Sequence, residues 1–358
     1  MSEAAGEDRV IVVGAGIAGL SAARALAAEG RDVVVIERAR GVGGRCATRR
    51  IEGDQPVDFG LAFLYGREPE FLAALAEVPG ARLPGWPSAI HGSGRSCQPE
   101  AFAEGEQRVA FVDGVAAFPR HLARGLDVRL STRLIRLEIK GSTIALEIEG
   151  AAPLAARTVV LALAVEQSRS LVASLPARSS GLDTVSALLA MIPSQPCLTV
   201  IAVYPKSAPA PDFHLSYPED SAVLQIIAHD SSKRVDPAFT VMVYQAHPRW
   251  SREHLDPPGA QLTTASSDAW ARALLAEAAR LLGPWAAAPS SFQAHRWSHA
   301  RLDGPGVHAP ILLNLPGTPA PGPRLGFAGE LFSPGGGASA AWMSGVRLAR
   351  MILAEDKR

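Results

Sequence analysis

Six residues near the start of the chain form a glycine-rich turn, Gly14-Ala15-Gly16-Ile17-Ala18-Gly19, of the kind that binds phosphate groups. In such a turn the first glycine permits a tight bend, the second lets a pyrophosphate approach the backbone, and the third lets a helix pack closely on a strand. Glu37 lies 18 residues beyond Gly19 and provides a carboxylate that can accept hydrogen bonds from ribose hydroxyls. A carboxylate at this place favours a dinucleotide with a free 2′-hydroxyl, FAD or NAD, over NADP.

A strand–helix–strand unit has to position these groups. Val10–Val13 is a short β-rich run before the turn, and Asp32–Glu37 is a second one. Between them, Leu20–Glu29 is an alanine-rich helix former that Gly30 ends. A turn that only packs a helix on a strand is the alternative, but it does not account for the acid. We therefore predict a parallel βαβ unit whose cofactor-binding residues are Gly14, Ala15, Gly16, Ala18 and Gly19.

A second glycine-rich turn follows Glu37 directly. The run Arg38-Ala39-Arg40-Gly41-Val42-Gly43-Gly44-Arg45 places basic side chains and paired glycines beside the expected ribose site. Gly43 and Gly44 would let the chain pass close to the cofactor, and Arg45 would offer a planar guanidinium to the pyrophosphate. The alternative is a solvated basic loop. We count Arg38, Gly43, Gly44 and Arg45 among the cofactor-binding candidates.

Composition limits the remaining possibilities. The 358 residues allow two domains, and 35 basic residues balance 35 acidic ones, which argues against nucleic acid as a partner. Three cysteines (Cys46, Cys97 and Cys197) lie far apart, so we expect no disulfide framework and no metal site. The acidic start does not resemble a secretory signal, and the longest uncharged stretch, residues 184–205, is broken by prolines. We expect a cytoplasmic protein without a membrane span.

The pattern of elements predicts an α/β fold: a Rossmann-like FAD-binding domain with an inserted, mostly antiparallel β-sheet substrate domain. Val128–Ile139 alternates like one strand, Ser266–Leu282 is a long helix, and a final helix begins at about Ser339. The expected divisions are 1–80, 107–173 and 291–358 for the FAD-binding domain, 81–106 for a crossing segment, and 174–290 for the substrate domain.

At this point the chain resembles a known family. Gly14–Gly19, Glu37 and Gly41–Arg45 look like the FAD-binding signature of the flavin-containing amine oxidase superfamily. Within it, Gly43–Arg50 followed by Val57-Asp58-Phe59-Gly60 is similar to renalase and its bacterial relatives. Further similar runs come in the same order at 111–115, 126–134, 294–301 and 326–330. The resemblance covers most of the chain, is weakest from about 175 to 290, and implies FAD as the cofactor.

The resemblance also implies places for further residues. Gly329 and Glu330 would contact the ribityl-pyrophosphate region, and Leu134 would contact adenine through its main chain. The start of the last helix would face the pyrimidine end of the flavin, where backbone N–H groups stabilise negative charge on the reduced ring. The residues implied there are Ala341, Trp342 and Met343, with plain helix packing as the alternative for the last two. The residues implied near the flavin N5 are Gly60, Leu61, Ala62 and Phe63.

Two departures from the family pattern concern the substrate side. Ala62 stands where the family usually has Gln, and Ser339 stands where it usually has Glu. Glu330 replaces the usual Asp and keeps the carboxylate. Amine oxidases often have a lysine near N5, and this chain has none in a matching segment. Cys46 replaces an apolar residue of the motif, where a small buried filler is favoured over covalent flavin attachment.

Three residues at alternating positions, His295, Trp297 and His299, are the catalytic candidates. A strand would point them to one face, where a histidine could accept a substrate proton or influence the protonation of the flavin. The alternative is a buried strand in which the Trp packs and the His residues bond locally. Arg296 and Arg301 could hold an anionic substrate, or form surface salt bridges instead.

The cofactor implies the class of reaction: oxidation of a small organic substrate by hydride transfer to N5, with dioxygen as the acceptor. A disulfide reductase is disfavoured because neither a second GxGxxG turn nor a dithiol is found. The resemblance implies dihydronicotinamide isomers as substrates. An amine oxidase or desaturase acting on a natural-product intermediate is the alternative, and a catalytically silent flavin-binding protein is the alternative of another class. The oligomeric state stays open.

Overall fold

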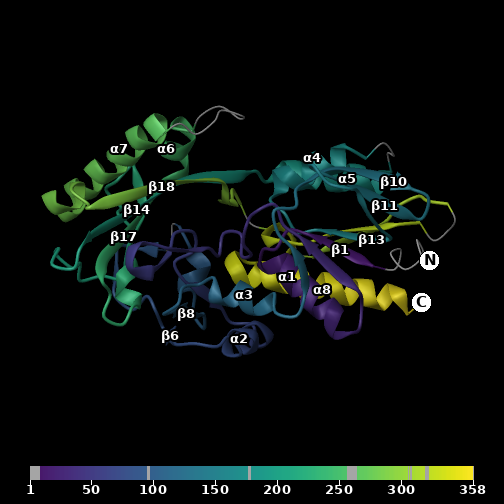
Figure 1. Ribbon diagram of the computed structural model, residues 1–358, viewed down its shortest axis with the longest axis horizontal. Coiled ribbons are helices and arrows are strands. Elements are labelled where there is room, and N and C mark those ends of the chain that lie inside the picture. The colour runs from purple at the N-terminus through teal and green to yellow at the C-terminus, as the bar shows by residue number, and fades with distance from the viewer. Residues whose placement is uncertain are drawn as a thin grey trace.

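Two six-stranded sheets form the centres of the two halves of the molecule (Figure 1). The structure is a computed structural model that describes residues 9–94, 97–175, 179–255, 264–304, 306, 309–318 and 322–357. Figure 1 shows β1, near the start of the described residues, and α8, near their end, in the half that holds the first sheet. Both halves contribute to the site described below.

The first sheet has the strand order β19-β20-β13-β1-β2-β9. Its strands are β1 (Val10–Val13), β2 (Val33–Ile36), β9 (Asp127–Arg129), β13 (Thr158–Leu161), β19 (Ile311–Asn314) and β20 (Arg324–Phe327). All neighbouring strands are parallel apart from the antiparallel pair β19 and β20. Every residue of β1, β2 and β13 is buried, as expected of a parallel sheet that is covered on both faces.

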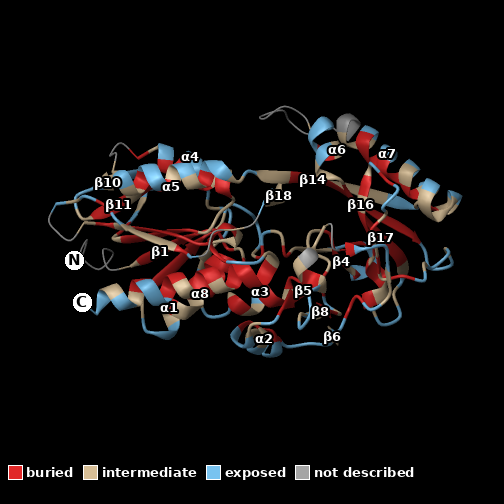
Figure 2. Ribbon diagram, turned by 180° about the vertical axis from the view of Figure 1, so that it is seen from behind, coloured by how far each residue is buried: buried red, intermediate tan, exposed pale blue. Residues whose placement is uncertain are grey.

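Helices cover one face of this sheet, and helices with a small sheet cover the other (Figure 2). On the first face lie α1 (Ile17–Ala28), α3 (Ala117–Leu122) and α8 (Gly337–Asp356). On the second lie α4 (Val165–Ala173), α5 (Ser180–Met191) and the strands β10 (Leu134–Lys140), β11 (Thr143–Ile148) and β12 (Leu154–Ala156). Fully buried side chains such as Leu20, Leu26 and Ile352 close the first interface, and Leu137 and Leu146 close the second.

The second sheet has the strand order β18-β14-β17-β16-β15-β7. Its strands are β7 (Ile90–His91), β14 (Ser194–Pro205), β15 (Leu215–Ser216), β16 (Leu224–His229), β17 (Phe239–Ala246) and β18 (Ser291–Leu302). All pairs are antiparallel except β15 with β7. The helix α7 (Thr264–Leu282) covers the outer face through Trp270 and Leu274, and α6 (Pro248–Glu253) packs against β14. The opposite face points toward the first half.

Short elements connect the two halves. They are the hairpin β3 (Thr48–Arg50) and β4 (Pro56–Asp58), the small sheet of β5 (Leu64–Gly66), β6 (Arg82–Pro84) and β8 (Gln107–Phe111), the helix α2 (Pro69–Ala76), and the single turns η2 (Glu52–Asp54), η4 (Pro99–Phe102), η5 (Asp230–Lys233), η6 (Pro284–Ala287) and η7 (Glu330–Phe332). Among the described residues, no helix is both long and apolar enough to cross a bilayer.

The expected class, an α/β fold with a Rossmann-like half and a mostly antiparallel second sheet, is confirmed. Three local expectations differ from the structure. Val128–Ile139 is two strands in separate sheets, because Ser131 has a φ of 52° and turns the chain between β9 and β10. β18 belongs to the second sheet, although residues after 290 were expected in the first half. α5 packs with the first half through Leu182, Val185 and Leu189, although it lies beyond residue 173.

Candidate cofactor and active site

A cleft of about 2260 Å³ runs between the two halves. At one end its walls are the glycine-rich turn after β1, including Gly14 and Gly16, and Glu37 at the end of β2. At the other end its walls include His295 and Trp297 from β18. The two groups of residues that the sequence singled out therefore share one continuous space.

The three glycines of the first turn have three different surroundings. Gly14 has a φ of 105°, and a Cβ on it would lie 2.5 Å from the carbonyl oxygen of Ala162. A Cβ on Gly19 would lie 1.9 Å from the Gly14 oxygen, so α1 can start this close to β1 only with glycine there. A Cβ on Gly16 would meet no atom within 4 Å and would project into open space. The turn thus leaves a cradle for a phosphate at Gly16, the N-cap of α1, which no side chain caps.

Glu37 lies where the ribose of a dinucleotide is expected. One carboxylate oxygen accepts a hydrogen bond from the N–H of Ala15 (2.9 Å) and the other from the N–H of Ala39 (2.8 Å). These two bonds hold the carboxylate at the edge of the cleft and leave lone pairs on both oxygens for ligand hydroxyls. Arg38 and Leu134, two further expected contacts, line the same end of the cleft.

The second glycine-rich turn is held against the first, because the N–H of Gly43 donates to the Ala15 oxygen at 2.8 Å. Gly43 and Gly44 line the cleft with φ values of 112° and 55°. Arg45 was expected to offer its guanidinium to a pyrophosphate, but here it forms an ion pair with Glu330 (2.8 Å) and donates to the Ala300 oxygen (3.0 Å). The turn is thereby connected to β18 and to the segment that begins α8.

The start of α8 presents a different set of residues to the cleft from the set expected. Gly337, Ala338 and Ala341 line it, and the N–H of Gly337 donates to Glu330 at 3.1 Å. Trp342 instead packs in the core against Phe71, with ring centroids 5.9 Å apart. Met343 also packs against that core, outside the lining. Trp342 and Met343 follow Ala341 by one and two positions, so they lie on another side of α8 and face the core.

The segment after β4 forms the wall where the two halves meet. Gly60, Leu61 and Ala62 line the cleft, whereas Phe63 is fully buried and packs against Trp86. The Gly60 oxygen accepts a hydrogen bond from the Gln245 amide of β17 (2.6 Å), and the N–H of Leu61 donates to the Arg45 oxygen (3.0 Å). These bonds hold the segment to both halves.

Two of the catalytic candidates lie on the inner face of β18. Phe59 stacks on Trp297 with ring centroids 5.2 Å apart and meets His295 edge-on at 4.8 Å. The Trp297 indole N–H donates to the Phe59 oxygen at 3.2 Å. Burial, together with the nearby Arg49 cation, lowers the pKa of His295 to about 4, so its ring is neutral at neutral pH. The three residues form an aromatic wall of the cleft.

His299 is separated from that wall. The pairing of β18 with β14 shifts register after Trp297, so the strict alternation expected of the three candidates stops there. His299 Nδ1 lies 3.1 Å from a carboxylate oxygen of Glu166 at the start of α4. Burial lowers the pKa of His299, and the Glu166 carboxylate opposes that effect. All three candidates therefore line the cleft, but only His295 and Trp297 belong to the aromatic wall.

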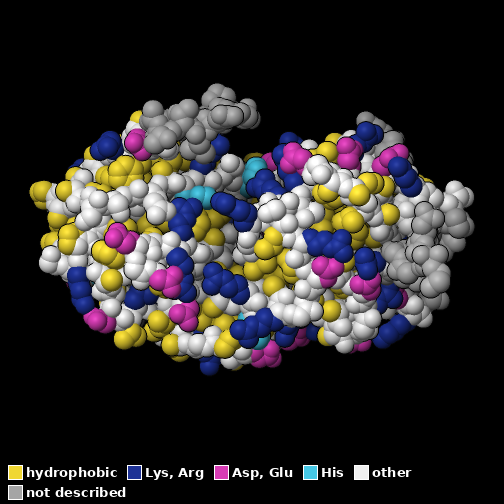
Figure 3. All heavy atoms as spheres, in the orientation of Figure 1, with side chains coloured by type: hydrophobic (Ala, Val, Ile, Leu, Met, Phe, Trp, Pro, Cys, Tyr) yellow, Lys and Arg dark blue, Asp and Glu magenta, His cyan; other side chains and the backbone are white. Residues whose placement is uncertain are grey.

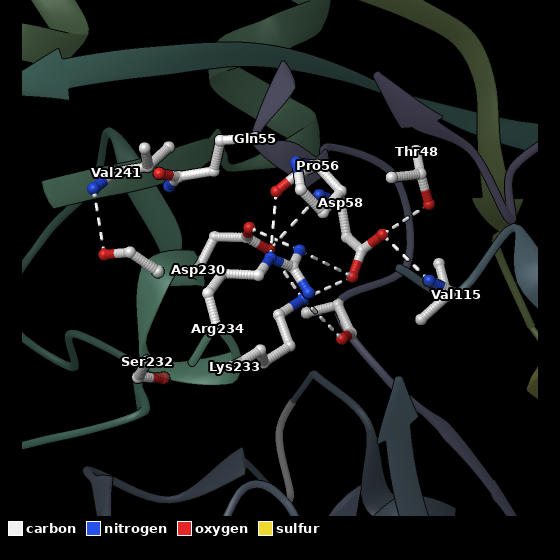
Figure 4. Close-up of polar contacts among 12 residues, drawn as sticks. Thr48, Gln55, Pro56, Asp58, Val115, Asp230, Ser232, Lys233, Arg234 and Val241 are labelled. Carbon is white, nitrogen blue, oxygen red and sulfur yellow. Dashed lines mark hydrogen bonds and ion pairs between the residues drawn. The ribbon is translucent and has the colours of Figure 1, made fainter. Parts of the chain in front are cut away.

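A buried ionic cluster lies behind the segment that forms the wall (Figure 4). Lys233 Nζ lies 2.5 Å from Asp58 and 2.5 Å from Asp230, and it also donates to the Ala62 oxygen at 3.1 Å. Arg234 pairs with Asp230 at 2.8 Å and with Asp58 at 3.6 Å. Asp58 also accepts hydrogen bonds from Thr48 (2.6 Å) and from the N–H of Val115 (2.9 Å). Two acids balance two bases, and the cluster joins η5 to β4.

Sequence reasoning missed Lys233, and it did not single out Arg49 or Tyr65 of the cleft lining. Asp58 and Lys233 are 175 positions apart, so only the fold brings them together. Arg49 lies over the Phe59 ring at 4.6 Å and donates to Gln293 at 2.7 Å. A basic residue beside an aromatic wall leaves no periodic signal in a sequence.

Cys46 behaves as the small buried filler expected of it. Its thiol donates to the Val115 oxygen at 3.3 Å. Burial and the neighbouring Asp58 carboxylate raise the pKa of this thiol, so it stays protonated. A protonated thiol is a poor nucleophile, which disfavours covalent attachment of a cofactor here.

Two family models match the chain. Residues 12–78 match the NAD(P)-binding Rossmann-like domain, and residues 96–353 match the flavin containing amine oxidoreductase family. A stretch of 77 residues is 43% identical to the putrescine oxidase of Kocuria rosea, and it covers 22% of this chain and 16% of that protein. Another of 69 residues is 45% identical to the putative flavin-containing monoamine oxidase AofH of Mycobacterium tuberculosis, and it covers 19% and 15%.

Solved structures of similar fold cover almost the whole chain. The cyclohexylamine oxidase of Brevibacterium oxydans superposes with a TM-score of 0.69 over 98% of this chain and all of its own, at 18% identity. Putrescine oxidase bound to putrescine gives 0.67 over 97% and 99%, at 15% identity. At these identities the similarity of the structures shows the fold alone. The family is shown by the model that matches residues 96–353. The chain belongs to the family of flavin-containing amine oxidoreductases, and its cofactor is FAD.

Proposed function

We propose that the protein oxidises a carbon–nitrogen bond of a small organic substrate and passes the electrons on to dioxygen. One observation carries this proposal: the cleft runs without interruption from the phosphate cradle at Gly16 to the aromatic wall of Phe59, His295 and Trp297. A dinucleotide that starts at the cradle and extends along the cleft brings its flavin end toward that wall. When bound, FAD supplies a hydride acceptor at N5.

The residues of the wall suit a substrate that becomes positively charged as hydride leaves the carbon next to nitrogen. The faces of Phe59 and Trp297 attract such a charge through their ring quadrupoles. His295 is neutral at neutral pH because its pKa is lowered to about 4, so it does not repel the charge. The second sheet, through Gln245, fixes the neighbouring segment by a hydrogen bond to the Gly60 oxygen.

A second candidate substrate is a dihydronicotinamide isomer, as in renalase. The runs at 43–50 and 57–60 and the run at 294–301 favour it, because they carry the renalase-like pattern and contribute Arg45, Phe59, His295 and Trp297 to the cleft. Both candidates lose a hydride from carbon, so the same arrangement of residues serves either. Ala62, which lines the cleft, departs there from the usual family pattern, whereas Ser339, the other departure, lies outside the lining and donates to Glu68.

Anaerobic mixing of the purified yellow protein with two substrate panels tests the proposal. One panel holds primary, secondary and tertiary amines, and the other holds reduced-nicotinamide isomers. We expect the flavin absorbance to fade with one panel and to return on admission of air, with one equivalent of hydrogen peroxide. Fading with amines only supports carbon–nitrogen oxidation of an amine, and fading with the isomers only supports the renalase-like reaction. A flavin that neither panel reduces would point to a catalytically silent flavin-binding protein.

A further inference from the structure

Arg301, near the end of β18, is a cation of the cleft lining for which the described residues provide no carboxylate partner within salt-bridge distance. Its guanidinium donates instead to the thiol sulfur of Cys97 (2.9 Å) and to the Cys97 oxygen (3.4 Å). Glu330 is the acid that acts on it electrostatically, but one oxygen of Glu330 is paired with Arg45 and the other accepts from Gly337. The positive charge of Arg301 is therefore not matched by the protein.

A buried charge without an ionic partner lowers the stability of the folded protein. Removing a guanidinium from water without an ionic partner destabilises a protein, and buried charges are for that reason normally paired. The contrast with Lys233 is direct, because the buried lysine has two carboxylates at 2.5 Å whereas Arg301 has a thiol and a carbonyl. A thiol is a weak acceptor, and both bonds use the same nitrogen, Nη1. Within the described residues the Nε and Nη2 groups donate to no acceptor, and the side chain belongs to the cleft lining.

Arg301 lies among polar side chains of the cleft lining. Cys97, Cys197 and His247 belong to the same lining and lie within electrostatic range of the guanidinium. Burial lowers the pKa of His247, and the Arg301 cation lowers it further, so this neighbour adds no second charge. Figure 3 shows basic side chains gathered around the hollow between the two halves, and arginines outnumber carboxylates along the lining.

We propose that Arg301 binds an anionic group of the substrate, a carboxylate or a phosphate. The proposal rests on the oxidation proposed above and names the substrate class of that same cleft: an oxidisable carbon–nitrogen group and an anion carried by one molecule. The planar guanidinium presents parallel N–H donors that match two oxygens of such a group. The anion also offsets the positive charge that develops on the substrate as hydride leaves.

A binding experiment tests the anion site without any turnover. Flavin-loaded protein is titrated with benzoate as the carboxylate probe and with phenyl phosphate as the phosphate probe, and changes in the visible flavin spectrum report binding. We expect one probe to bind, and the stronger of the two identifies the anion. Arg301→Gln should weaken that binding about 10- to 100-fold, as for the loss of charge-assisted hydrogen bonds, and Arg301→Lys should restore part of it. Arg350→Gln, an exposed arginine on α8, is the matched control.

A second experiment compares paired substrates that differ in whether they carry the anionic group. N-benzylglycine is compared with N-benzylglycinamide, and a dihydronicotinamide mononucleotide isomer with its riboside, by the rate of anaerobic flavin reduction. We expect the charged member of the productive pair to reduce the flavin at least tenfold faster at low concentration, and to lose that advantage in Arg301→Gln.

The two experiments separate the failure of this inference from the failure of the proposed function. If neither pair reduces the flavin but an anion binds through Arg301, the oxidation is wrong and the anion site stands. If the neutral members react as fast as the charged ones, or if Arg301→Gln binds both probes like wild type, the anion site is wrong. Should the glutamine variant not retain flavin, the wild-type substrate pairs still decide.

Discussion

At the scale of single residues, the cleft divides between groups that the protein itself satisfies and groups that it leaves for a ligand. Arg45 and Glu330 pair with each other, whereas Glu37 keeps lone pairs and Arg301 keeps donors. This distinction follows from hydrogen-bond geometry and not from residue type. A sequence can therefore name Glu37 and Arg45 as equal candidates, although the fold gives them different tasks.

Replacement of Glu37 by alanine should weaken FAD binding by about 1–3 kcal/mol, the usual effect of losing hydrogen bonds to a charged group. Flavin content of the purified variant and dialysis against known FAD concentrations measure the change. Glu29→Ala, an exposed acid at the end of α1, is the control and should keep full occupancy. Full occupancy in Glu37→Ala as well would contradict the placement of the ribose.

His295 makes the stability of the protein depend on pH. Its folded-state pKa of about 4 lies below the ordinary value of 6.5, so the unfolded chain binds a proton that the folded protein does not. Stability should therefore fall as the pH drops from about 6.5 to about 4, and be unaffected by this group above 7. His295→Gln should reduce the fall, measured by urea unfolding at pH 7.5 and pH 5. Equal losses in both proteins would refute this assignment.

At the scale of elements, the βαβ unit around the first turn could be predicted because strand, glycines and acid lie within 28 residues, from Val10 to Glu37. Local signals suffice there. The division of Val128–Ile139 could not be predicted, because a positive φ at Ser131 has no sequence pattern that separates it from a continuous strand. The expected place of Trp342 at the cleft was wrong for a related reason. The sequence does not show which side of α8 faces the core, and in the structure Ala341 lines the cleft whereas Trp342 packs against Phe71.

The first turn allows a paired test. Gly16→Ala should cost less than about 1 kcal/mol of unfolding free energy, because its Cβ meets open space. It should still lower FAD affinity about tenfold or more, because that space is the phosphate cradle. Gly19→Ala should lower stability itself by about 1–3 kcal/mol, because its Cβ would overlap the Gly14 oxygen. Thermal melts of the FAD-free proteins and FAD titrations separate the two effects.

At the scale of the whole molecule, the two halves are joined by polar as well as apolar contacts. Lys233 and Arg234 of η5 reach Asp58 of β4, and Gln245 of β17 reaches the Gly60 oxygen. Sequence reasoning separated the halves but not their junction, since each of these contacts spans more than 170 positions. The same limit hid the membership of β18 in the second sheet.

Lys233→Met should destabilise the protein by about 3–5 kcal/mol, because Asp58 and Asp230 would stay buried without their shared cation. Lys206→Met, which removes an exposed ion pair with Asp236, is the control and should leave the stability close to that of the wild-type protein, because solvent screens this pair. Urea unfolding measures both. A combined Lys233→Met, Asp230→Asn variant should recover part of the loss, and no recovery would argue against charge imbalance as the cause.

The order of the first sheet has a consequence for biosynthesis. β20 and α8 lie within residues 324–356, yet β20 pairs with β13, and the start of α8 lines the cleft beside Glu330. A nascent chain therefore cannot finish its nucleotide-binding half until β20 and α8 have been made, and the strands of the second sheet emerge from the ribosome before them. Acquisition of the flavin is in this way postponed until β20 and α8 have left the ribosome, after the second sheet has already had time to form.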